Sequence, residues 1–323
     1  MRRLYIHIGY PKTGTTTLQN FLAHNAAGLA ARGVLYPRAG QLHDAHYGIN
    51  FALDIAGHAR PADYPNPTGI AEAIAAEAEA VGAQSVVISS EYFITAQAPD
   101  RRRVKQYFAG YDVRIMCYLR RHDAAMESAY AQAVKTVITP PWHDSIQGFI
   151  VYHMGLGDVS YDYLGVLRQW AGVFGAKAMI VRPYEAAQNM PDLPGDFLAA
   201  IGVADGPDLV RPASANLSIG PRVAATIRLV RRTGLDDERK RQVVGRLIML
   251  AARERERAHF LAPIEREAII RRYDWMYRLI ASEFLGRDNG VLFTAPKPSD
   301  ADGPVAPVYS TEELVETILR AGG

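Results

Sequence analysis

The sequence has little of what marks secreted, membrane-bound or nucleic-acid-binding proteins. Cys117 is its only cysteine, so no disulfide can form within the chain, which fits a reducing compartment. No apolar run approaches the length of a membrane helix, and too few apolar residues precede Gly9 for a signal-peptide core. Lysine and arginine number 36 against 34 acidic residues, which argues against nucleic acid or a membrane as a general partner. We therefore expect a cytoplasmic protein that binds neither.

What the sequence does contain is a distinctive first segment, residues 4–22, LYIHIGYPKTGTTTLQNFL. Its apolar residues alternate at first and return at helical spacing after three threonines, which predicts a strand, a turn and a helix over residues 15–31. The start of a helix has unpaired N–H groups and a partial positive charge, which suit a phosphate. Glycines would let the backbone approach the anion, and Lys12 and the threonine hydroxyls would add donors. The candidate anion-binding residues are Pro11, Lys12, Thr13, Gly14, Thr15, Thr16 and Thr17.

Strand and helix patterns alternate after this segment. Residues 85–90, SVVISS, and 113–119, VRIMCYL, are short apolar runs typical of buried parallel strands. Alternation of this kind predicts a three-layer α/β/α fold with a central parallel sheet. Ligands in such folds bind at the carboxyl ends of the strands. Glu91 and Arg120, which directly follow these two strands, are therefore candidate site residues.

The later part of the chain is predicted to be mostly helical, with helices over residues 221–232, 238–257 and 264–285. We expect one domain over residues 1–285. Within it, residues 139–158 are rich in proline, glycine and aromatic residues and are predicted to be an inserted loop or lid at the acceptor site rather than core. Residues 286–323 are expected to form a linker rich in Pro, Gly and Asp and a short last helix, for which Ser310 and Glu313 form a capping box.

Two motifs resemble those of sulfotransferases that use 3′-phosphoadenosine 5′-phosphosulfate (PAPS). In a Walker A loop the lysine follows the second glycine, whereas here Lys12 precedes Gly14, in the order Pro-Lys-Thr-Gly-Thr-Thr. That order resembles the 5′-phosphosulfate loop of the family. The segment CYLRRHDAAMESAY resembles its 3′-phosphate motif, with Arg120 at a strand end and Ser128 eight residues later. Arg121-His122 replaces the usual Asp-Pro, which is closer to bacterial and carbohydrate-type members.

The resemblance implies a P-loop NTPase-like fold and an enzyme that transfers a sulfuryl group from PAPS, without a metal. The acceptor would be a hydroxyl of a carbohydrate or another small metabolite. Lys12 would stabilise the leaving oxygen, the loop would hold the 5′ end, and Arg120 and Ser128 would bind the 3′-phosphate. Glu91 would be the base, as in members with Ser-Ser-Glu at this place. Burial would raise the pKa of Glu91, and Lys12 would lower it.

Several alternatives remain open at this point. Glu91 could instead form a structural ion pair or a helix cap. The candidates for acceptor contacts are His46 and His153, and the candidates for ring stacking are Tyr47, Trp142 and Tyr152. A loop histidine, instead of Glu91, could be the base. The rival functions are an atypical small-molecule kinase, which would need ATP and Mg²⁺, and a non-catalytic nucleotide-binding protein. The sequence identifies neither the acceptor nor the oligomeric state.

Overall fold

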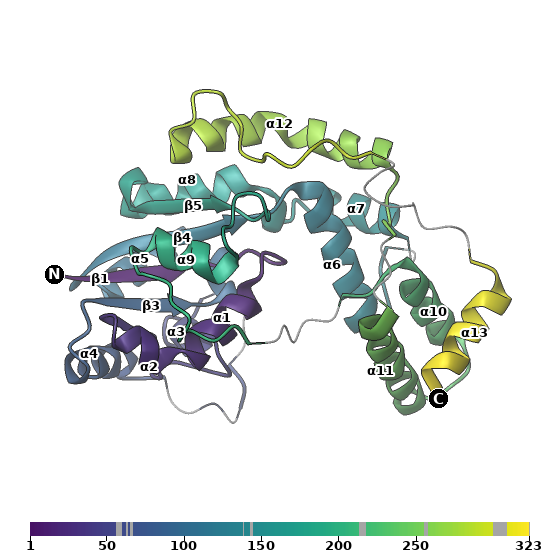
Figure 1. The fold of residues 1–323 in the computed structure, drawn as a ribbon, viewed down its shortest axis with the longest axis horizontal. Helices are drawn as coiled ribbons and strands as arrows, with labels where there is room; N and C mark the ends of the chain where they lie inside the picture. Colours follow the sequence, from purple (N-terminus) through teal and green to yellow (C-terminus); the bar gives the residue numbers. More distant parts are fainter. Residues whose placement is uncertain are drawn as a thin grey trace. The chain divides into compact units, whose positions relative to one another are not determined.

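A computed structural model describes most of the chain, namely residues 1–55, 60–62, 64, 67–137, 139–142, 145–212, 218–254, 258–299 and 309–322. The elements are drawn along the chain in Figure 1. They divide into two compact units. The first contains Met1–Arg120, Asp162–Ala213 and Met276–Ala295, and the second contains Arg121–Tyr161, Ser214–Trp275 and Pro296–Gly323. The prediction of one domain over residues 1–285 stays a prediction.

The first unit is built on a parallel sheet of five strands. These are β1 (Arg2–His7), β2 (Val34–Leu35), β3 (Ser85–Ser89), β4 (Tyr111–Leu119) and β5 (Met179–Pro183), in the order β2-β3-β1-β4-β5. The register pairs His7 of the central strand with Ser89 on one side and Met116 on the other. The carboxyl ends of β1, β3 and β4 therefore meet at one edge of the sheet, as the sequence predicted.

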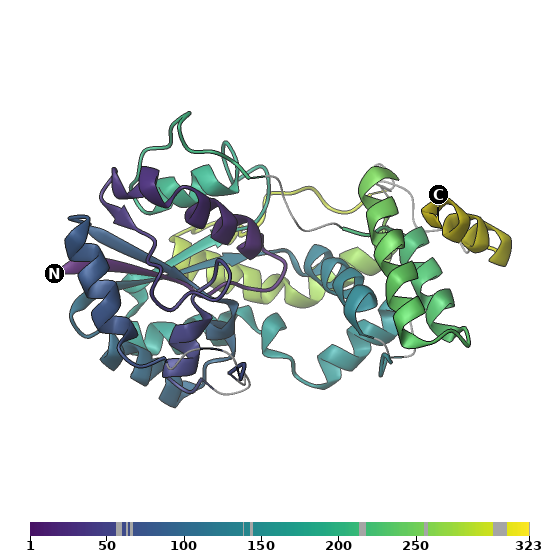
Figure 2. The same ribbon diagram turned by 90° about the horizontal axis from the view of Figure 1, so that it is seen from below.

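Helices cover both faces of this sheet, as Figures 1 and 2 show. One face packs against α1 (Thr15–His24), α2 (Ala26–Ala30) and α9 (Leu193–Ala200), and the other lies under α4 (Ile70–Ala80), α5 (Ala98–Tyr107) and α8 (Tyr163–Phe174). The strand order explains this arrangement. From β1 to β2 the chain moves across the sheet in one direction, and from β2 onward it moves in the other, so right-handed crossovers place the connecting helices on opposite faces. The predicted three-layer α/β/α class with a central parallel sheet is confirmed.

One predicted helix is interrupted. The pattern predicted a single helix over residues 15–31, whereas α1 ends at His24 and α2 begins at Ala26. Asn25 lies at the break, and its amide donates to the carbonyls of Phe21 and Val210, both at 2.8 Å. The same amide accepts from the N–H of Val210 at 2.8 Å. This buried side chain therefore ends the first helix by bonding to a segment that is distant in the sequence.

The second unit is helical, which confirms the predicted helical character of the C-terminal half. It contains α6 (His122–Thr136), α7 (Ile146–Gly155), η2 (Val159–Tyr161), α10 (Pro221–Arg232), α11 (Asp237–Glu254), the first part of α12 (Pro263–Leu285) and α13 (Thr311–Gly322). The expectation that residues 139–158 are loop rather than core was wrong. Trp142 and the α7 side chains Ile146 and Phe149 are buried in the core of this unit. The lid role of the segment stays a prediction.

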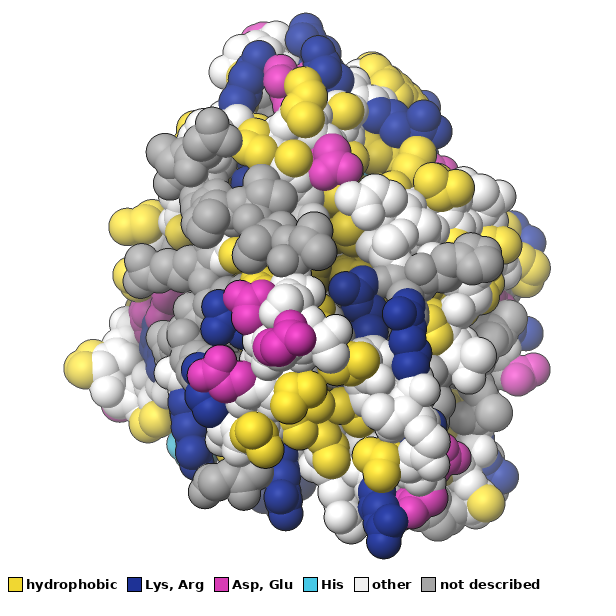
Figure 3. All heavy atoms as spheres, turned by 90° about the vertical axis from the view of Figure 1, so that its right-hand side faces the viewer, with side chains coloured by type: hydrophobic (Ala, Val, Ile, Leu, Met, Phe, Trp, Pro, Cys, Tyr) yellow, Lys and Arg dark blue, Asp and Glu magenta, His cyan; other side chains and the backbone are white. Residues whose placement is uncertain are grey.

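The charged surface of these helices is mixed rather than basic. Arg239 and Arg241 of α11 pair with Asp236 and Glu238 at 3.6 and 3.0 Å. On the side of the molecule drawn in Figure 3, basic and acidic side chains alternate with apolar ones. Within the described part of the chain, no helix combines the length and the apolar character that crossing a membrane requires.

Candidate active site

The loop between β1 and α1, residues 8–14, has an unusual backbone. Lys12 has a φ of +66° and Gly14, the residue before α1, has a φ of +75°. A Cβ atom at Gly14 would lie 2.5 Å from Leu193 Cδ2 and 3.0 Å from Tyr184 Cε2, so any other residue would displace Leu193 and be strained at this φ. A left-handed lysine costs of order 1–3 kcal/mol, a strain that proteins keep mainly at functional sites.

The loop leaves a row of donors without partners. Thr13 donates its hydroxyl to the carbonyl of Tyr10 at 2.7 Å, and Thr15 donates to the same oxygen at 3.2 Å. The hydroxyls of Thr16 and Thr17 are half-buried, and neither bonds to another described residue. None of the backbone N–H groups of residues 12–17 donates to a described residue either. Two hydroxyls thus stabilise the loop, while two hydroxyls and a set of N–H groups remain available to an anion.

The structure brings Lys12 and Arg120 together. Arg120, which follows β4, donates from Nη1 to the carbonyl oxygen of Lys12 at 3.0 Å. Burial, and next the nearby Arg120, lower the pKa of the half-buried Lys12, and Glu91 acts in the opposite direction. Two cations held this close destabilise each other, so an anion bound between them would be favoured.

Glu91 lies beside this pair, at the end of β3. It is the first residue of η1 (Glu91–Thr95), and Ser90 rather than Glu91 caps that turn by accepting from the N–H of Tyr92 at 3.2 Å. Burial raises the pKa of Glu91, and this outweighs a hydrogen bond from Thr15 and the charge of Lys12, which both lower it. No cation of a described residue lies within 4.0 Å of Glu91, and its pKa is raised, which is the direction that a general base at neutral pH needs.

Two tyrosines complete the arrangement and were not assigned a role from the sequence. The guanidinium carbon of Arg120 lies 5.7 Å from the centre of the Tyr184 ring, which itself packs against Gly14. Tyr163 donates its hydroxyl to the carbonyl of Arg120 at 2.9 Å. The available sequence signal for Tyr184 is its position directly after β5, another carboxyl end at the same edge of the sheet.

The remaining candidates make other contacts or belong to the second unit. Ser128 is a half-buried residue of α6, in the second unit, so its pairing with Arg120 stays a prediction. His46 is fully buried: its Nδ1 accepts from the N–H of Ser89 at 3.2 Å, and its Nε2 donates to the carbonyl of Pro37 at 2.9 Å. It lines no pocket. His153 bonds to Asp158 at 2.9 Å.

Metal ligands are not gathered in this part of the molecule. Among the residues that the structure describes, no three His, Cys, Asp or Glu side chains come together as a metal-binding group. The single cysteine, Cys117, is buried in β4, and burial raises the pKa of its thiol, so it is a core residue rather than a nucleophile.

Comparisons with known proteins give two similarities. No protein-family model matches the chain. An uncharacterized protein from Archaeoglobus fulgidus is 27% identical over 176 residues, which cover 52% of this chain and 45% of that protein. The match thus spans about half the length of this relative. The crystal structure of a sulfotransferase from Alicyclobacillus acidocaldarius is similar at a TM-score of 0.42 and 16% identity, over 76% of this chain and 96% of that one.

Proposed function

We propose that this chain is a PAPS-dependent sulfotransferase, which transfers a sulfuryl group to a hydroxyl of a carbohydrate or another small metabolite. The observation that carries the proposal is the convergence of three strand ends. The loop after β1 offers unpaired N–H groups and Lys12, the end of β3 offers Glu91, and the end of β4 offers Arg120. An anion site next to a carboxyl group of raised pKa suits the transfer of an anionic group to an alcohol.

The residues fit the two charged ends of PAPS. The loop N–H groups and the hydroxyls of Thr16 and Thr17 would hold the 5′-phosphosulfate. Arg120 keeps guanidinium N–H groups beyond the one bonded to Lys12, and these would bind the 3′-phosphate together with Ser128. Under this proposal the positive charge comes from Lys12, Arg120 and the loop, and no metal is required.

The proposed reaction is a single in-line displacement. The acceptor oxygen forms a bond to sulfur while the bond between sulfur and the bridging oxygen of the 5′-phosphate breaks. Lys12 stabilises the negative charge that develops on the leaving phosphate, and Glu91 accepts the proton of the acceptor hydroxyl. The products are a sulfate ester and adenosine 3′,5′-bisphosphate, and the proton then passes from Glu91 to water.

A ligand panel tests the proposal. Melting temperatures measured with PAPS, adenosine 3′,5′-bisphosphate, ATP with Mg²⁺ and GTP with Mg²⁺ should rise for the first two only. Transfer of label from ³⁵S-PAPS into a metabolite extract should then follow. Stabilisation by ATP alone would support the kinase instead, and tight binding of the bisphosphate without transfer to any acceptor would support the non-catalytic protein.

A further inference from the structure

Three aromatic side chains gather beside Glu91. Tyr47 and Phe51 belong to α3 (Tyr47–Ala52), and Tyr92 follows Glu91 in η1. The ring centres of Tyr47 and Tyr92 are 4.3 Å apart with an interplanar angle of 35°, and Phe51 meets Tyr92 edge-on at 6.2 Å. All three side chains are half-buried, so the cluster keeps part of its ring surface accessible.

This cluster is held in a fixed place relative to Glu91. Ser90 donates its hydroxyl to Oδ1 of the buried Asn50 at 2.5 Å, which ties the end of β3 to α3. The same hydroxyl oxygen accepts from the N–H of Tyr92. Because Glu91 lies between Ser90 and Tyr92, these bonds position the carboxyl group and both tyrosine rings together.

The hydroxyl of Tyr47 also has spare hydrogen-bonding capacity. It bonds to no other described residue, although tyrosine hydroxyls that are partly buried usually find a partner. Burial, and then the charge of Glu91 and the neighbouring Tyr92, raise the pKa of Tyr47 to about 12. The hydroxyl therefore stays protonated at neutral pH and is a donor close to the proposed base.

We infer that Tyr47, Phe51 and Tyr92 form the acceptor subsite, and that the accepting hydroxyl is carried on a ring, aromatic or sugar, whose apolar face packs against them. This inference rests on the proposed function. The faces of aromatic rings bind both other aromatic rings and the apolar faces of sugars, so the shared chemistry is a ring bearing a hydroxyl. With the ring on this cluster, its hydroxyl reaches Glu91, and Tyr47 donates to a second oxygen of the acceptor. Trp142, another sequence candidate for stacking, is buried in the core of the second unit.

Acceptor competition tests the inference. Transfer of ³⁵S-sulfate should be measured for a phenol, for a methyl pyranoside and for an acyclic polyol of similar size. The inference predicts a kcat/KM for at least one ring acceptor that is at least ~10-fold above that of the polyol, a difference of about 1.4 kcal/mol. The first two compounds distinguish an aromatic from a sugar acceptor. Equal use of the acyclic polyol would overturn the inference.

Substitutions of Tyr47 and Tyr92 test whether the preference for a ring acceptor comes from this cluster. Tyr47→Ala and Tyr92→Ala should each lower kcat/KM for the ring acceptor by ~10-fold or more, with unchanged affinity for adenosine 3′,5′-bisphosphate. Tyr47→Phe should retain ring packing and lose only the part due to the hydroxyl. Tyr107→Ala on α5 is the matched control and should leave kcat/KM unchanged. Tyr92→Leu replaces Tyr92→Ala if the latter does not fold. Unchanged acceptor kinetics in both tyrosine variants would overturn the inference.

A binding measurement separates this inference from the reaction itself. Saturation-transfer NMR should detect the ring compound on the wild-type protein in the presence of adenosine 3′,5′-bisphosphate, and should lose it on Tyr92→Ala. If the ring binds in this way but no sulfate is transferred, the subsite stands and the proposed reaction fails. If sulfate is transferred and the ring signal is the same in Tyr92→Ala, the reaction stands and the subsite is wrong.

Discussion

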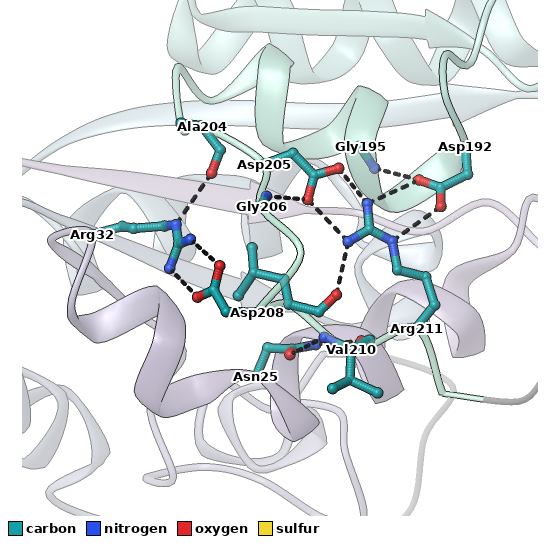
Figure 4. A network of polar contacts seen from close by, with 11 residues as sticks. Asn25, Arg32, Asp192, Gly195, Ala204, Asp205, Gly206, Asp208, Val210 and Arg211 are labelled. Carbon is teal, nitrogen blue, oxygen red and sulfur yellow. Dashed lines mark hydrogen bonds and ion pairs between the residues drawn. The ribbon is translucent and has the colours of Figure 1, made fainter.

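Two polar clusters of the first unit contain similar residues and differ in what those residues bond to. In the cluster of Figure 4, Arg211 donates to Asp192 at 3.0 Å and also pairs with Asp205. Nearby, Arg32 donates to both carboxylate oxygens of Asp208, at 2.9 and 2.7 Å. Hydrogen bonds to Asp205, and next to Asp192, raise the pKa of Arg211. Both guanidinium groups are therefore already paired with carboxylates of the protein itself.

The cluster at the carboxyl ends of β1, β3 and β4 is the opposite case. Lys12 has no carboxylate within 4.0 Å among the described residues, and its pKa is lowered where that of Arg211 is raised. The number of charged residues therefore does not distinguish a structural cluster from a binding site. What distinguishes them is whether each cation already has its counter-ion, because a cation without one gains more free energy from an anionic ligand than a cation that is already paired.

The largest expected effect is on catalysis, in Lys12→Ala. Turnover with PAPS should fall by ~10²–10³-fold, since a charge that stabilises the leaving phosphate is lost. The melting temperature should not fall, because the lost cation has a lowered pKa and no ion pair. The matched control is Lys105→Ala, which removes an exposed lysine of α5. Both variants are compared with wild type by steady-state kinetics and by thermal melting. A normal turnover in Lys12→Ala would remove Lys12 from the mechanism.

Glu91→Gln should separate activity from stability. Turnover should fall by ~10²-fold or more, and the acid limb of the pH–rate profile should disappear. Burial raises the pKa of Glu91, so ionised Glu91 destabilises the fold as the pH rises above the ordinary pKa of glutamate. The variant should therefore melt at a higher temperature than wild type at pH 7 but not at pH 4. Glu72→Gln on α4 serves as the control. If Glu91→Gln kept its turnover and the acid limb of its pH–rate profile, a group other than Glu91 would accept the proton of the acceptor hydroxyl.

Arg120→Ala tests the nucleotide end of the site. Loss of charge-assisted hydrogen bonds to a phosphate should weaken binding of adenosine 3′,5′-bisphosphate by ~10-fold or more in calorimetry. Arg120→Lys should recover only part of this, since lysine has no planar fork of donors. The control is Arg114→Ala, which removes an arginine from within β4. Equal affinity of wild type and Arg120→Ala would place the phosphate elsewhere.

The smallest expected effect is on stability, in Arg211→Ala. Removing the partner of two half-exposed carboxylates should lower the free energy of unfolding by about 1–2 kcal/mol at pH 7 and leave nucleotide affinity unchanged. A hydrogen bond to Arg211 is the main cause of the lowered pKa of Asp205, so this contribution is present above the ordinary aspartate pKa. The deficit should therefore shrink as the pH falls below about 4 in denaturant titrations. If this variant instead lost nucleotide affinity with no change in stability, the contrast between the clusters would be wrong.

Local patterns predicted much of this fold. The apolar runs identified β1, β3 and β4, and α10 begins and ends at the predicted residues 221 and 232. The predicted capping box before α13 is confirmed, since Ser310 N–H donates to Glu313 at 2.7 Å and Glu313 N–H to Ser310 at 3.2 Å. These features depend on residues within a few positions of one another, so the sequence contains the information directly.

What the sequence could not predict depends on distant partners. The break at Asn25 requires Val210, and the placement of Tyr47 beside Glu91 requires the bond between Asn50 and Ser90. The burial of Trp142 likewise depends on helices that follow much later in the chain. For the candidate site, strand ends predicted the convergence of Lys12, Glu91 and Arg120. The role of Tyr184 could not be predicted, because it depends on the contact of its ring with Gly14 and with Arg120, both distant in the sequence.

Hydrogen exchange with and without adenosine 3′,5′-bisphosphate tests the central claim most directly. The unpaired N–H groups of residues 12–17 should exchange more slowly when the ligand is bound, whereas residues 204–211, which belong to the paired cluster of Figure 4, should show no change. Saturating ligand that leaves the exchange of residues 12–17 unaltered would contradict the claim that this loop is the anion site.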